Sequence, residues 1–415
     1  MPNNQQPILN VPHVCILGGG FAGLYTALYL SNSAWARSGR CKITLVEPND
    51  RFLFSPLSYE LITGELQAWE IAPSYQKLLA NTGVVLCEQK MQKVALKNRE
   101  VTLEDGTALN YDYLVFAVGA QNRWATISGL RAYALTFRTL ADAERLEAKL
   151  TILGASERQW LKVIILGGGA SGVELACKIA DRLGKRAQVH LIERGDEILK
   201  PFPSGLRKAA YRAMRARRIQ VECGTEVIAV ETESITVMRN DQIVELPADL
   251  VLWAAGTESR EPIARLNAAK NERGQLLTRP TLQLVDHPEV FALGDVAEVR
   301  NQHKIVPATA QAAYQQASRA AKNLEALMRG KPLRPFRYLH LGDMLTLGKG
   351  AAIVSSFSIN LEGQLAAIVR RLVYIQRLPT LRHRWQVLEH LLNSTMAKIL
   401  RWFNYGTQKQ NNRSS

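Results

Sequence analysis

The sequence lacks the features of an exported or membrane-spanning protein. Residues 1–12 are polar and contain neither the basic nor the apolar region of a signal peptide, so we predict that the protein is not secreted. No stretch of about 18 uninterrupted apolar residues occurs, which argues against a membrane-spanning helix. Any contact with a membrane is therefore expected to be peripheral.

Cysteine is scarce, and its spacing is uninformative. The cysteines form no C-x-x-C motif and no metal-ligand pattern; they are Cys15, Cys41, Cys87, Cys177 and Cys223. We therefore expect neither a disulfide framework nor a metal site. Cys15 and Cys177 lie in apolar runs, so both are predicted to be buried as small hydrophobic side chains.

The remaining composition is that of a folded protein with one basic end. With 415 residues, of which 47% are hydrophobic and 21% charged, the chain is long enough for two or three domains. Residues 331–415 contain 13 Lys and Arg against 3 Asp and Glu, which places +10 of the net charge of +15 in this part. Because no recognised nucleic-acid-binding module accompanies the charge, we do not expect nucleic acid as a partner.

One pattern occurs twice. Residues 14–23 form an apolar strand that runs into G-x-G-x-x-G, and residues 163–172 repeat it. Behind each copy comes an amphipathic helical stretch and a second apolar strand that ends in an acid, Glu47 or Glu193. A single G-x-G-x-x-G is weak evidence, but two copies with correct flanks predict two βαβ units that bind dinucleotides.

Each residue type in this pattern has a physical role. The first glycine makes a tight turn, the second lets a pyrophosphate approach the backbone, and the third lets the helix pack against the strand. The helix N-terminus offers N–H groups to the phosphates, and the acid can bind a ribose diol. The predicted contacts are Gly18, Gly20, Phe21, Ala22, Gly23 and Glu47 in the first unit, and Gly167, Gly169, Gly172 and Glu193 in the second.

Three later segments are predicted to complete the two dinucleotide-binding units. Residues 111–119 and 248–256 are apolar strands that end at Gly119 and Gly256, where backbone can pass close to a nucleotide. A further strand ends in Gly-Asp, and Asp295 can accept hydrogen bonds from the ribityl hydroxyls of a flavin; an aspartate that caps a turn is the alternative. We therefore assign FAD to the first unit and NADH or NADPH to the second.

The order of the segments predicts an α/β fold with two Rossmann-like domains. The FAD-binding domain is expected to be discontinuous, over residues 11–125 and 281–350, with the NAD(P)H-binding domain inserted at residues 126–280. Residues 351–415 are expected to form a basic region of amphipathic helices.

Two helices are predicted in this C-terminal region, on either side of Pro379. Each has an apolar stripe and basic residues away from it. The first stripe is Leu361, Leu365, Ile368, Leu372 and Ile375, opposite Arg370 and Arg377; the second is Trp385, Leu388, Leu392, Met396, Ile399 and Phe403, away from Arg384, Lys398 and Arg401. Such helices bind anionic membrane surfaces. Packing on the core or a homodimer seam is the alternative.

Together these motifs resemble the two-dinucleotide flavoprotein reductases. Disulfide reductases of that superfamily carry a redox cysteine pair, and sulfide:quinone reductases need separated reactive cysteines, one of them late in the chain; neither pattern is present. Residues 307–316 are similar to the A-Q-x-A-x-Q-Q segment of the type II NAD(P)H:quinone oxidoreductases, and residues 335–348 resemble another stretch of that family. Residues 51–73 and 133–140 look like its cyanobacterial and plastid branch.

The resemblance implies an activity and a location. A hydride would pass from NAD(P)H to FAD, and two electrons would then pass to a membrane quinone. That branch implies demethylphylloquinone, in vitamin K1 synthesis, with plastoquinone as a second candidate. We expect the enzyme on the cytoplasmic side of a plasma or thylakoid membrane. A redox sensor, or a reductase of an iron–sulfur or haem protein, remains an alternative.

The resemblance also suggests roles for single residues. Gln315 and Gln316 would contact the quinone, because an amide can hydrogen-bond a carbonyl without burying charge; the alternative is a solvent-facing pair. Glu174 would orient the nicotinamide or relay a proton, or else stabilise its helix end. Glu193 favours NADH because a carboxylate repels a 2′-phosphate, whereas the adjacent Arg194 and the branch point to NADPH. The choice between NADH and NADPH therefore stays open.

Overall fold

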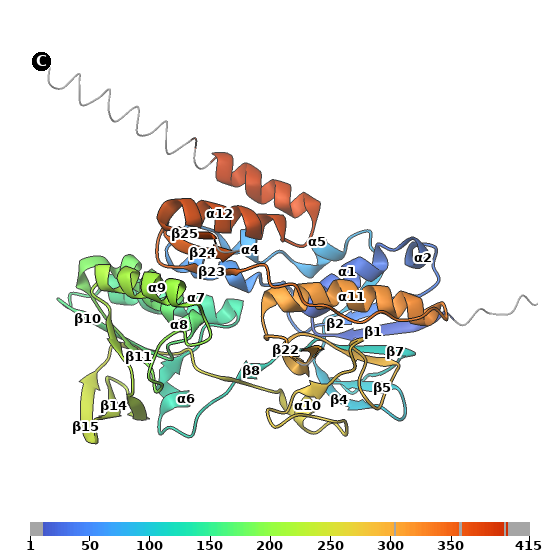
Figure 1. The fold of residues 1–415 in the computed structure, drawn as a ribbon, viewed down its shortest axis with the longest axis horizontal. Helices are drawn as coiled ribbons and strands as arrows, with labels where there is room; N and C mark the ends of the chain where they lie inside the picture. The colour runs from blue at the N-terminus through green and yellow to red at the C-terminus, as the bar shows by residue number, and fades with distance from the viewer. Residues whose placement is uncertain (1–10, 303, 357–358, 394–395, 397–415) are drawn as a thin grey trace, which may run out of the picture.

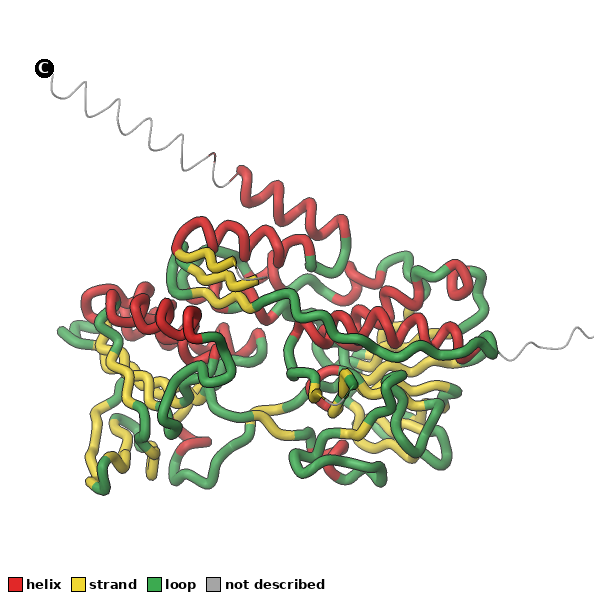
Figure 2. The backbone as a smooth tube through the Cα atoms, viewed as in Figure 1, coloured by secondary structure: helices red, strands yellow, loops and turns green. Residues whose placement is uncertain are grey.

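A computed structural model describes residues 11–302, 304–356, 359–393 and 396 of the chain. Two parallel β-sheets form its two halves, and helices cover their faces (Figure 1). The tube view shows the same division, with the second half at the left and the first at the right (Figure 2). Each half contains one copy of the repeated sequence pattern.

The first sheet has five parallel strands. In spatial order they are β19 (Val290–Ala292), β7 (Tyr113–Phe116), β1 (His13–Leu17), β2 (Lys42–Val46) and β3 (Val84–Cys87). The connection from β1 to β2 contains α1 (Phe21–Ser31), which packs on α11 (Ala310–Met328). Residues 14–17 of β1 are fully buried, as expected for a central parallel strand covered on both faces.

The second sheet repeats this arrangement. Its order is β12 (Gln220–Glu222), β11 (Ala187–Ile192), β10 (Leu161–Leu166), β16 (Leu250–Trp253) and β9 (Ala134–Leu135), again all parallel. The helix between β10 and β11 is α8 (Ala170–Leu183), and α7 (Leu140–Ala155) and α9 (Ser204–Ala216) belong to the same half. Cys177 on α8 and Cys15 on β1 are buried, as predicted, and burial raises the pKa of each thiol to about 12.

The repeat extends beyond the glycine motifs. Each half inserts a small antiparallel sheet before its fourth long strand. These sheets are β4 (Met91–Ala95), β5 (Glu100–Leu103) and β6 (Ala108–Asn110) in the first half, and β13 (Glu226–Val230), β14 (Ser234–Arg239) and β15 (Gln242–Pro247) in the second.

Short helices and strands connect these longer elements. They are α2 (Ala34–Arg37), η1 (Ser55–Leu57), α3 (Tyr59–Ile62), α4 (Ala68–Ile71), α5 (Tyr75–Leu79), α6 (Leu130–Tyr133), η2 (Gly184–Arg186), α10 (Glu261–Ala264), β18 (Leu276–Leu277), η3 (Gly294–Val296), β20 (Ala297–Glu298), β21 (Arg300–Asn301) and β22 (Lys304–Ile305).

The first half is discontinuous in sequence, as predicted. β19 comes from late in the chain and pairs with β7, after the whole second sheet has been formed. The chain crosses between the halves on β8 (Gln121–Asn122) and returns on β17 (Thr257–Glu258), and these two strands pair antiparallel (Figure 1). The two crossings therefore lie side by side.

The C-terminal region begins with a three-stranded antiparallel sheet and continues with helices over both halves (Figure 1). Its elements are β23 (Asp343–Thr346), β24 (Ala352–Ser356), β25 (Ile359–Glu362), α12 (Gly363–Gln376) and a helix over residues 381–393. The boundary expected at residue 350 falls between β23 and β24, which pair with each other. Leu345, Leu347 and Ile353 of this sheet pack into the core of the second half, so the sheet bridges the predicted division.

The apolar stripe of α12 faces outward. Leu365, Ile368 and Leu372 are 60%, 57% and 52% exposed. Two members of the predicted stripe differ, because Leu361 lies in β25 and Ile375 is buried. The stripe is therefore not packed on the core, which was one of the alternatives for this helix.

Of the two basic residues expected opposite the stripe, Arg377 lies at the C-cap of α12 and is half-buried, whereas Arg370 is buried instead of solvated. Arg370 lies opposite the stripe, as expected, but is only 2% exposed because buried carboxylates face it. In the following helix Leu381, Trp385 and Leu392 are exposed, and so is Met396. Lys398, Ile399, Arg401 and Phe403 lie outside the described residues. Among the described residues, no helix is both long and apolar enough to cross a bilayer.

Candidate functional site

The first and third glycines of each motif are required by the protein itself. Gly18 has φ +97°, and a Cβ there would lie 2.6 Å from the carbonyl oxygen of Ala117. A Cβ on Gly23 would lie 1.8 Å from the carbonyl oxygen of Gly18, and one on Gly172 would lie 1.9 Å from that of Gly167. These glycines make the tight turn and allow the close helix contact that the sequence predicts.

The middle glycine of each motif has no such role inside the protein. Gly20 and Gly169 have ordinary extended dihedral angles, with φ −66° and −73°, and a Cβ on either would meet nothing within 4 Å. Each stands at the N-terminus of a helix, α1 or α8, whose first N–H groups are free to bind an anion. A Cβ would fill this open space, so the arrangement fits a pyrophosphate at both turns, one from FAD and one from NAD(P)H.

The acids that end the second strands lie at the same turns. Glu47 Oε2 accepts a hydrogen bond of 2.7 Å from Gly19 N, and Glu193 Oε2 accepts one of 2.6 Å from Gly168 N. Each carboxylate is thus fixed beside the glycine turn of its own half, where a ribose diol would lie. Arg194 is exposed.

The closing segments bring Asp295 next to the second half. Arg138 Nη2 donates to Asp295 Oδ2 at 3.2 Å, and Arg260 Nε donates to Val118 O at 2.8 Å. Gly119 has φ +65° with open space at its Cβ position, whereas Gly256 has φ +72° and lies against Arg123. Arg138 lies in the stretch 133–140 that resembles the quinone oxidoreductase branch, but nothing in that stretch indicates this contact, and Arg260 carries no sequence signal.

The two residues between Gly20 and Gly23 point away from the turn. The Phe21 ring packs edge-on against Phe52 and Phe54, with centroids 5.3 and 5.1 Å apart, and Ala22 is buried. Any contact they make with a dinucleotide would therefore come from the backbone at the start of α1.

The glutamines of α11 bind backbone groups. Gln316 is buried, and its Oε1 accepts a hydrogen bond of 2.7 Å from Gly294 N, next to Asp295. Gln315 bonds both the carbonyl oxygen and the N–H of Leu339, at 2.8 and 3.0 Å. These contacts hold the turn at 294–295 and the segment 335–342. A quinone contact for either glutamine stays a prediction.

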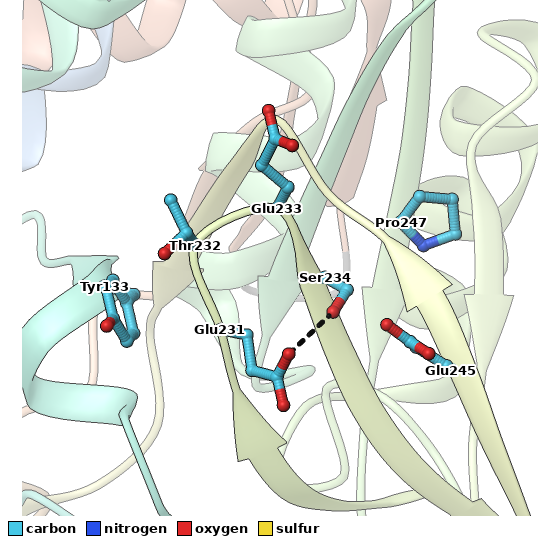
Figure 3. Close-up of a pocket in the computed structure, with 7 residues that line it drawn as sticks. All are labelled: Tyr133, Glu231, Thr232, Glu233, Ser234, Glu245 and Pro247. Carbon is cyan, nitrogen blue, oxygen red and sulfur yellow. Dashed lines mark hydrogen bonds between the residues drawn. The ribbon is translucent and has the colours of Figure 1, made fainter.

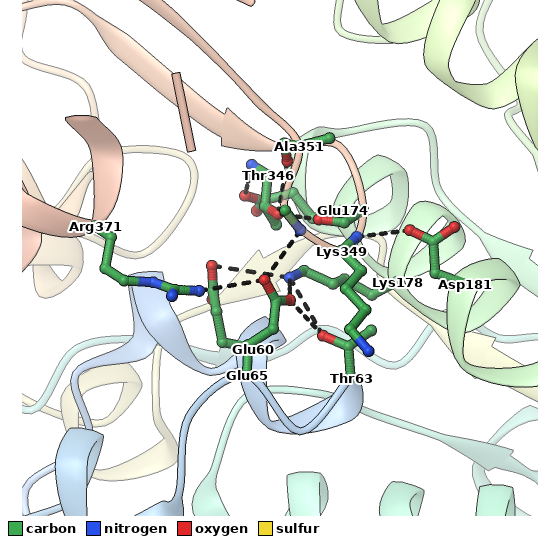
Figure 4. Close-up of polar contacts among 12 residues, drawn as sticks. Glu60, Thr63, Glu65, Glu174, Lys178, Asp181, Thr346, Lys349, Ala351 and Arg371 are labelled. Atoms are coloured by element: carbon green, nitrogen blue, oxygen red, sulfur yellow. Dashed lines mark hydrogen bonds and ion pairs between the residues drawn. The ribbon is translucent and has the colours of Figure 1, made fainter. Parts of the chain in front are cut away.

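A buried charged cluster joins three parts of the chain. Arg370 of α12 pairs with Glu60 of α3, lies 3.5 Å from Glu174 of α8, and donates to Pro56 O at 2.5 Å. Beside it, Lys178 of α8 pairs with Glu65. Figure 4 shows Glu60 and Glu65 of the first half, Glu174 and Lys178 of the second half and Arg371 of the C-terminal region converging. We call Glu60, Glu65, Glu174, Lys178, Arg370 and Arg371 the junction cluster.

Glu174 therefore lies in a junction between elements and not at a solvated helix end. Its Oε1 accepts a hydrogen bond of 2.9 Å from Thr346 N, which fixes β23 to α8 (Figure 4). Burial raises the pKa of Glu174 to about 7, although the Arg370 charge acts in the opposite direction. The orienting or proton-relay role stays a prediction. Glu60 lies in the stretch 51–73 that resembles the quinone oxidoreductase branch, but neither Glu60 nor Arg370 belongs to a motif that indicates this contact.

This pKa predicts a dependence of stability on pH. A carboxyl group whose pKa is raised from 4.5 to about 7 in the folded protein stabilises the fold below pH 4.5, and loses that contribution as the pH rises through 7. We expect Glu174→Gln to remove a decline of roughly 3 kcal/mol in unfolding free energy across this range. Denaturant unfolding at several pH values measures it; Glu362→Gln, at an exposed pair with Arg212, is the control and should keep the wild-type slope.

A separate hollow is lined by none of these residues. It has a volume of about 750 Å³ and is lined by Tyr133 and by residues of the β13–β15 sheet, three of them glutamates (Figure 3). An acidic hollow is unsuited to an anionic dinucleotide, and no residue of either glycine turn lines it. No group of His, Cys, Asp and Glu able to hold a metal occurs within the described part of the chain.

Known proteins are similar to this chain in sequence and in fold. The family model described as pyridine nucleotide-disulphide oxidoreductase matches residues 12–317. The chain is 43% identical over 381 residues to a demethylphylloquinone reductase of Synechocystis, covering 91% of this chain and 94% of that protein. It is 36% identical to an alternative NAD(P)H-ubiquinone oxidoreductase of Arabidopsis thaliana, covering 93% and 80%.

A solved structure extends the likeness to the fold. The NDH2 of Plasmodium falciparum in complex with NADH matches this chain with a TM-score of 0.82, at 18% identity, over 93% of this chain and 98% of that one. At this identity the likeness concerns the fold alone.

Proposed function

Since the chain belongs to the pyridine nucleotide-disulphide oxidoreductase family, and within it to the type II NAD(P)H:quinone oxidoreductases, we propose that its quinone is a membrane naphthoquinone, demethylphylloquinone. The protein is an FAD-dependent oxidoreductase that uses NAD(P)H. The observation that carries the finer proposal is the 43% identity, over nearly the whole of both chains, to a protein named demethylphylloquinone reductase. Plastoquinone is the second candidate.

Bound FAD supplies a two-electron relay between a hydride donor and a quinone. The residues of this chain bind and orient both partners. Gly20 and Glu47 hold one dinucleotide at the first glycine turn, and Gly169 and Glu193 hold the other at the second. Gln316 holds the turn at Gly294, and the carboxylate of the adjacent Asp295 would accept hydrogen bonds from the flavin side chain. The paired crossings β8 and β17 support a fixed relation between the two turns.

The C-terminal helices are proposed to rest on the membrane surface. Leu365, Ile368 and Leu372 form an exposed apolar stripe on α12, and the next helix exposes Leu381 and Trp385. Exposed apolar stripes of this kind bury themselves at the boundary between headgroups and acyl chains. A lipid-soluble quinone would be reached from that surface. The cytoplasmic side of a plasma or thylakoid membrane, and a homodimer, remain expectations.

The quinone class is tested by steady-state kinetics. With NADPH or NADH in excess, we expect kcat/KM for 2-phytyl-1,4-naphthoquinone to exceed that for plastoquinone by at least about tenfold, which is about 1.4 kcal/mol. Equal values would leave the protein a general quinone reductase. Turnover with neither quinone, but with an iron–sulfur or haem protein, would favour the reductase alternative. A change in partner binding without turnover would favour a redox sensor.

A further inference from the structure

A basic cleft lies beside the two C-terminal helices. It has a volume of about 360 Å³ and runs along α11, between the C-terminal end of α1 and the segment 335–342. Its walls carry two tyrosines, Tyr29 and Tyr314, and three cations, Arg319, Lys322 and Arg337. None of the residues that line it is acidic.

The three cations of this cleft have no partner of opposite charge. Among the described residues, none of Arg319, Lys322 and Arg337 forms an ion pair or a side-chain hydrogen bond, whereas Arg329 on the same helix pairs with Glu325. Three unpaired cations around one hollow repel one another, and an anion between them would remove that repulsion. The cleft therefore has the charge and the hydrogen-bond donors for a phosphate-bearing ligand.

The position of the cleft indicates which phosphate it would bind. Tyr25 donates to the carbonyl oxygen of Arg377, in the turn that joins α12 to the next helix. The Tyr25 ring contacts Tyr314 of the cleft, with centroids 4.8 Å apart. The basic cleft is thus fixed close to the base of both exposed apolar stripes. If the stripes enter a bilayer interface, the cleft stands at the level of the lipid headgroups.

We propose that this cleft binds the phosphodiester headgroup of an anionic phospholipid, such as phosphatidylglycerol. The inference rests on the proposed binding of the C-terminal helices to a membrane. The guanidinium groups of Arg319 and Arg337 and the ammonium of Lys322 bind the phosphate oxygens, and the tyrosine hydroxyls and Ser318 offer further hydrogen bonds. The headgroup then fixes the orientation of the protein on the surface, which the apolar stripes alone leave free.

The test compares R319Q/K322Q/R337Q with a control that loses the same charge elsewhere, K93Q/K97Q/R131Q. The control residues are exposed, and they belong to β4, the turn after it and α6, at the opposite end of the molecule from α12 (Figure 1). Binding of the FAD-loaded protein is measured by flotation with three kinds of vesicle. These are phosphatidylcholine alone, phosphatidylcholine with phosphatidylglycerol, and phosphatidylcholine with oleate at the same charge density. Reduction of a water-soluble quinone shows that each variant is folded.

The wild-type protein should bind phosphatidylglycerol vesicles more tightly than oleate vesicles. The cleft variant should lose tenfold to about a hundredfold in affinity for phosphatidylglycerol vesicles, and the control variant much less. Equal binding of wild-type protein to phosphatidylglycerol and oleate, or equal losses in both variants, would overturn the headgroup site while leaving the quinone reductase intact. Inorganic phosphate that binds the cleft without affecting vesicle binding would make it a site for free phosphate and overturn the proposal. No binding to any vesicle would instead contradict the proposed membrane contact.

Discussion

Gly20→Val is expected to give a folded protein that is purified without flavin. The extended backbone at Gly20 accepts any residue, and a Cβ there meets no protein atom within 4 Å. The valine side chain would instead occupy the space in front of the first N–H groups of α1. Losing two charged hydrogen bonds to a pyrophosphate corresponds to about 3 kcal/mol or more, a factor of at least about 100 in affinity. Flavin absorbance per protein and circular dichroism measure the two effects.

Gly169→Val is the matched variant in the second half. Its backbone is also extended and its Cβ position is equally open. We expect this variant to retain FAD and to lose reduction by NAD(P)H by at least about a hundredfold, measured by anaerobic stopped flow. Gly23→Val would not be informative, because its Cβ clashes with backbone and the fold itself should fail. If Gly20→Val kept its flavin, or Gly169→Val lost it, the assignment of the two turns would be wrong.

Arg370→Met should destabilise the protein by about 3–5 kcal/mol, because it leaves the Glu60 and Glu174 carboxyls buried without this partner. Arg370 is the part of the C-terminal region that reaches into both halves, so the loss should first loosen α12. Urea unfolding followed by circular dichroism measures the stability, and limited proteolysis shows whether the C-terminal region is cut first.

Arg371→Met provides the comparison. Its side chain is 30% exposed and pairs with Glu65, which keeps Lys178 as a second partner. We expect a loss of no more than about 1 kcal/mol. Adding Glu60→Leu to Arg370→Met should recover part of the stability, since it removes a buried carboxylate that has lost Arg370 and keeps only Lys178, at 4.0 Å. Equal stability of the two single variants would mean that the junction cluster does not hold the C-terminal region.

The two-sheet fold could be predicted because local rules determine it. The tight turn at Gly18 and the close helix contacts at Gly23 and Gly172 demand glycine, and the buried parallel strands demand continuous apolar runs. The positive φ of Gly18 and the contacts of Gly23 with Gly18 and of Gly172 with Gly167 lie within short segments, so a single sequence reveals them. The order of the segments also predicted the discontinuous first half, since the Gly-Asp turn comes after the second glycine motif.

The junction cluster could not be predicted, because its contacts join residues far apart in sequence. Arg370 has the pattern of a solvated helix face, and only the approach of α3 and α8 explains its burial. In the same way, Gln315 and Gln316 match a family motif, but what their amides bind depends on the distant segments around Leu339 and Gly294. The partners of charged and amide side chains are set by the tertiary structure, and the periodicity of the sequence does not indicate them.

The most direct test of the central claim follows the flavin of the wild-type protein bound to vesicles that contain 2-phytyl-1,4-naphthoquinone. NAD(P)H is added without oxygen, and the flavin absorbance is recorded by stopped flow. We predict rapid bleaching, and then recovery of the absorbance with one quinone reduced for each NAD(P)H oxidised. Flavin that bleaches, stays bleached in the presence of the vesicle quinone and recovers only with a soluble protein acceptor would contradict the account.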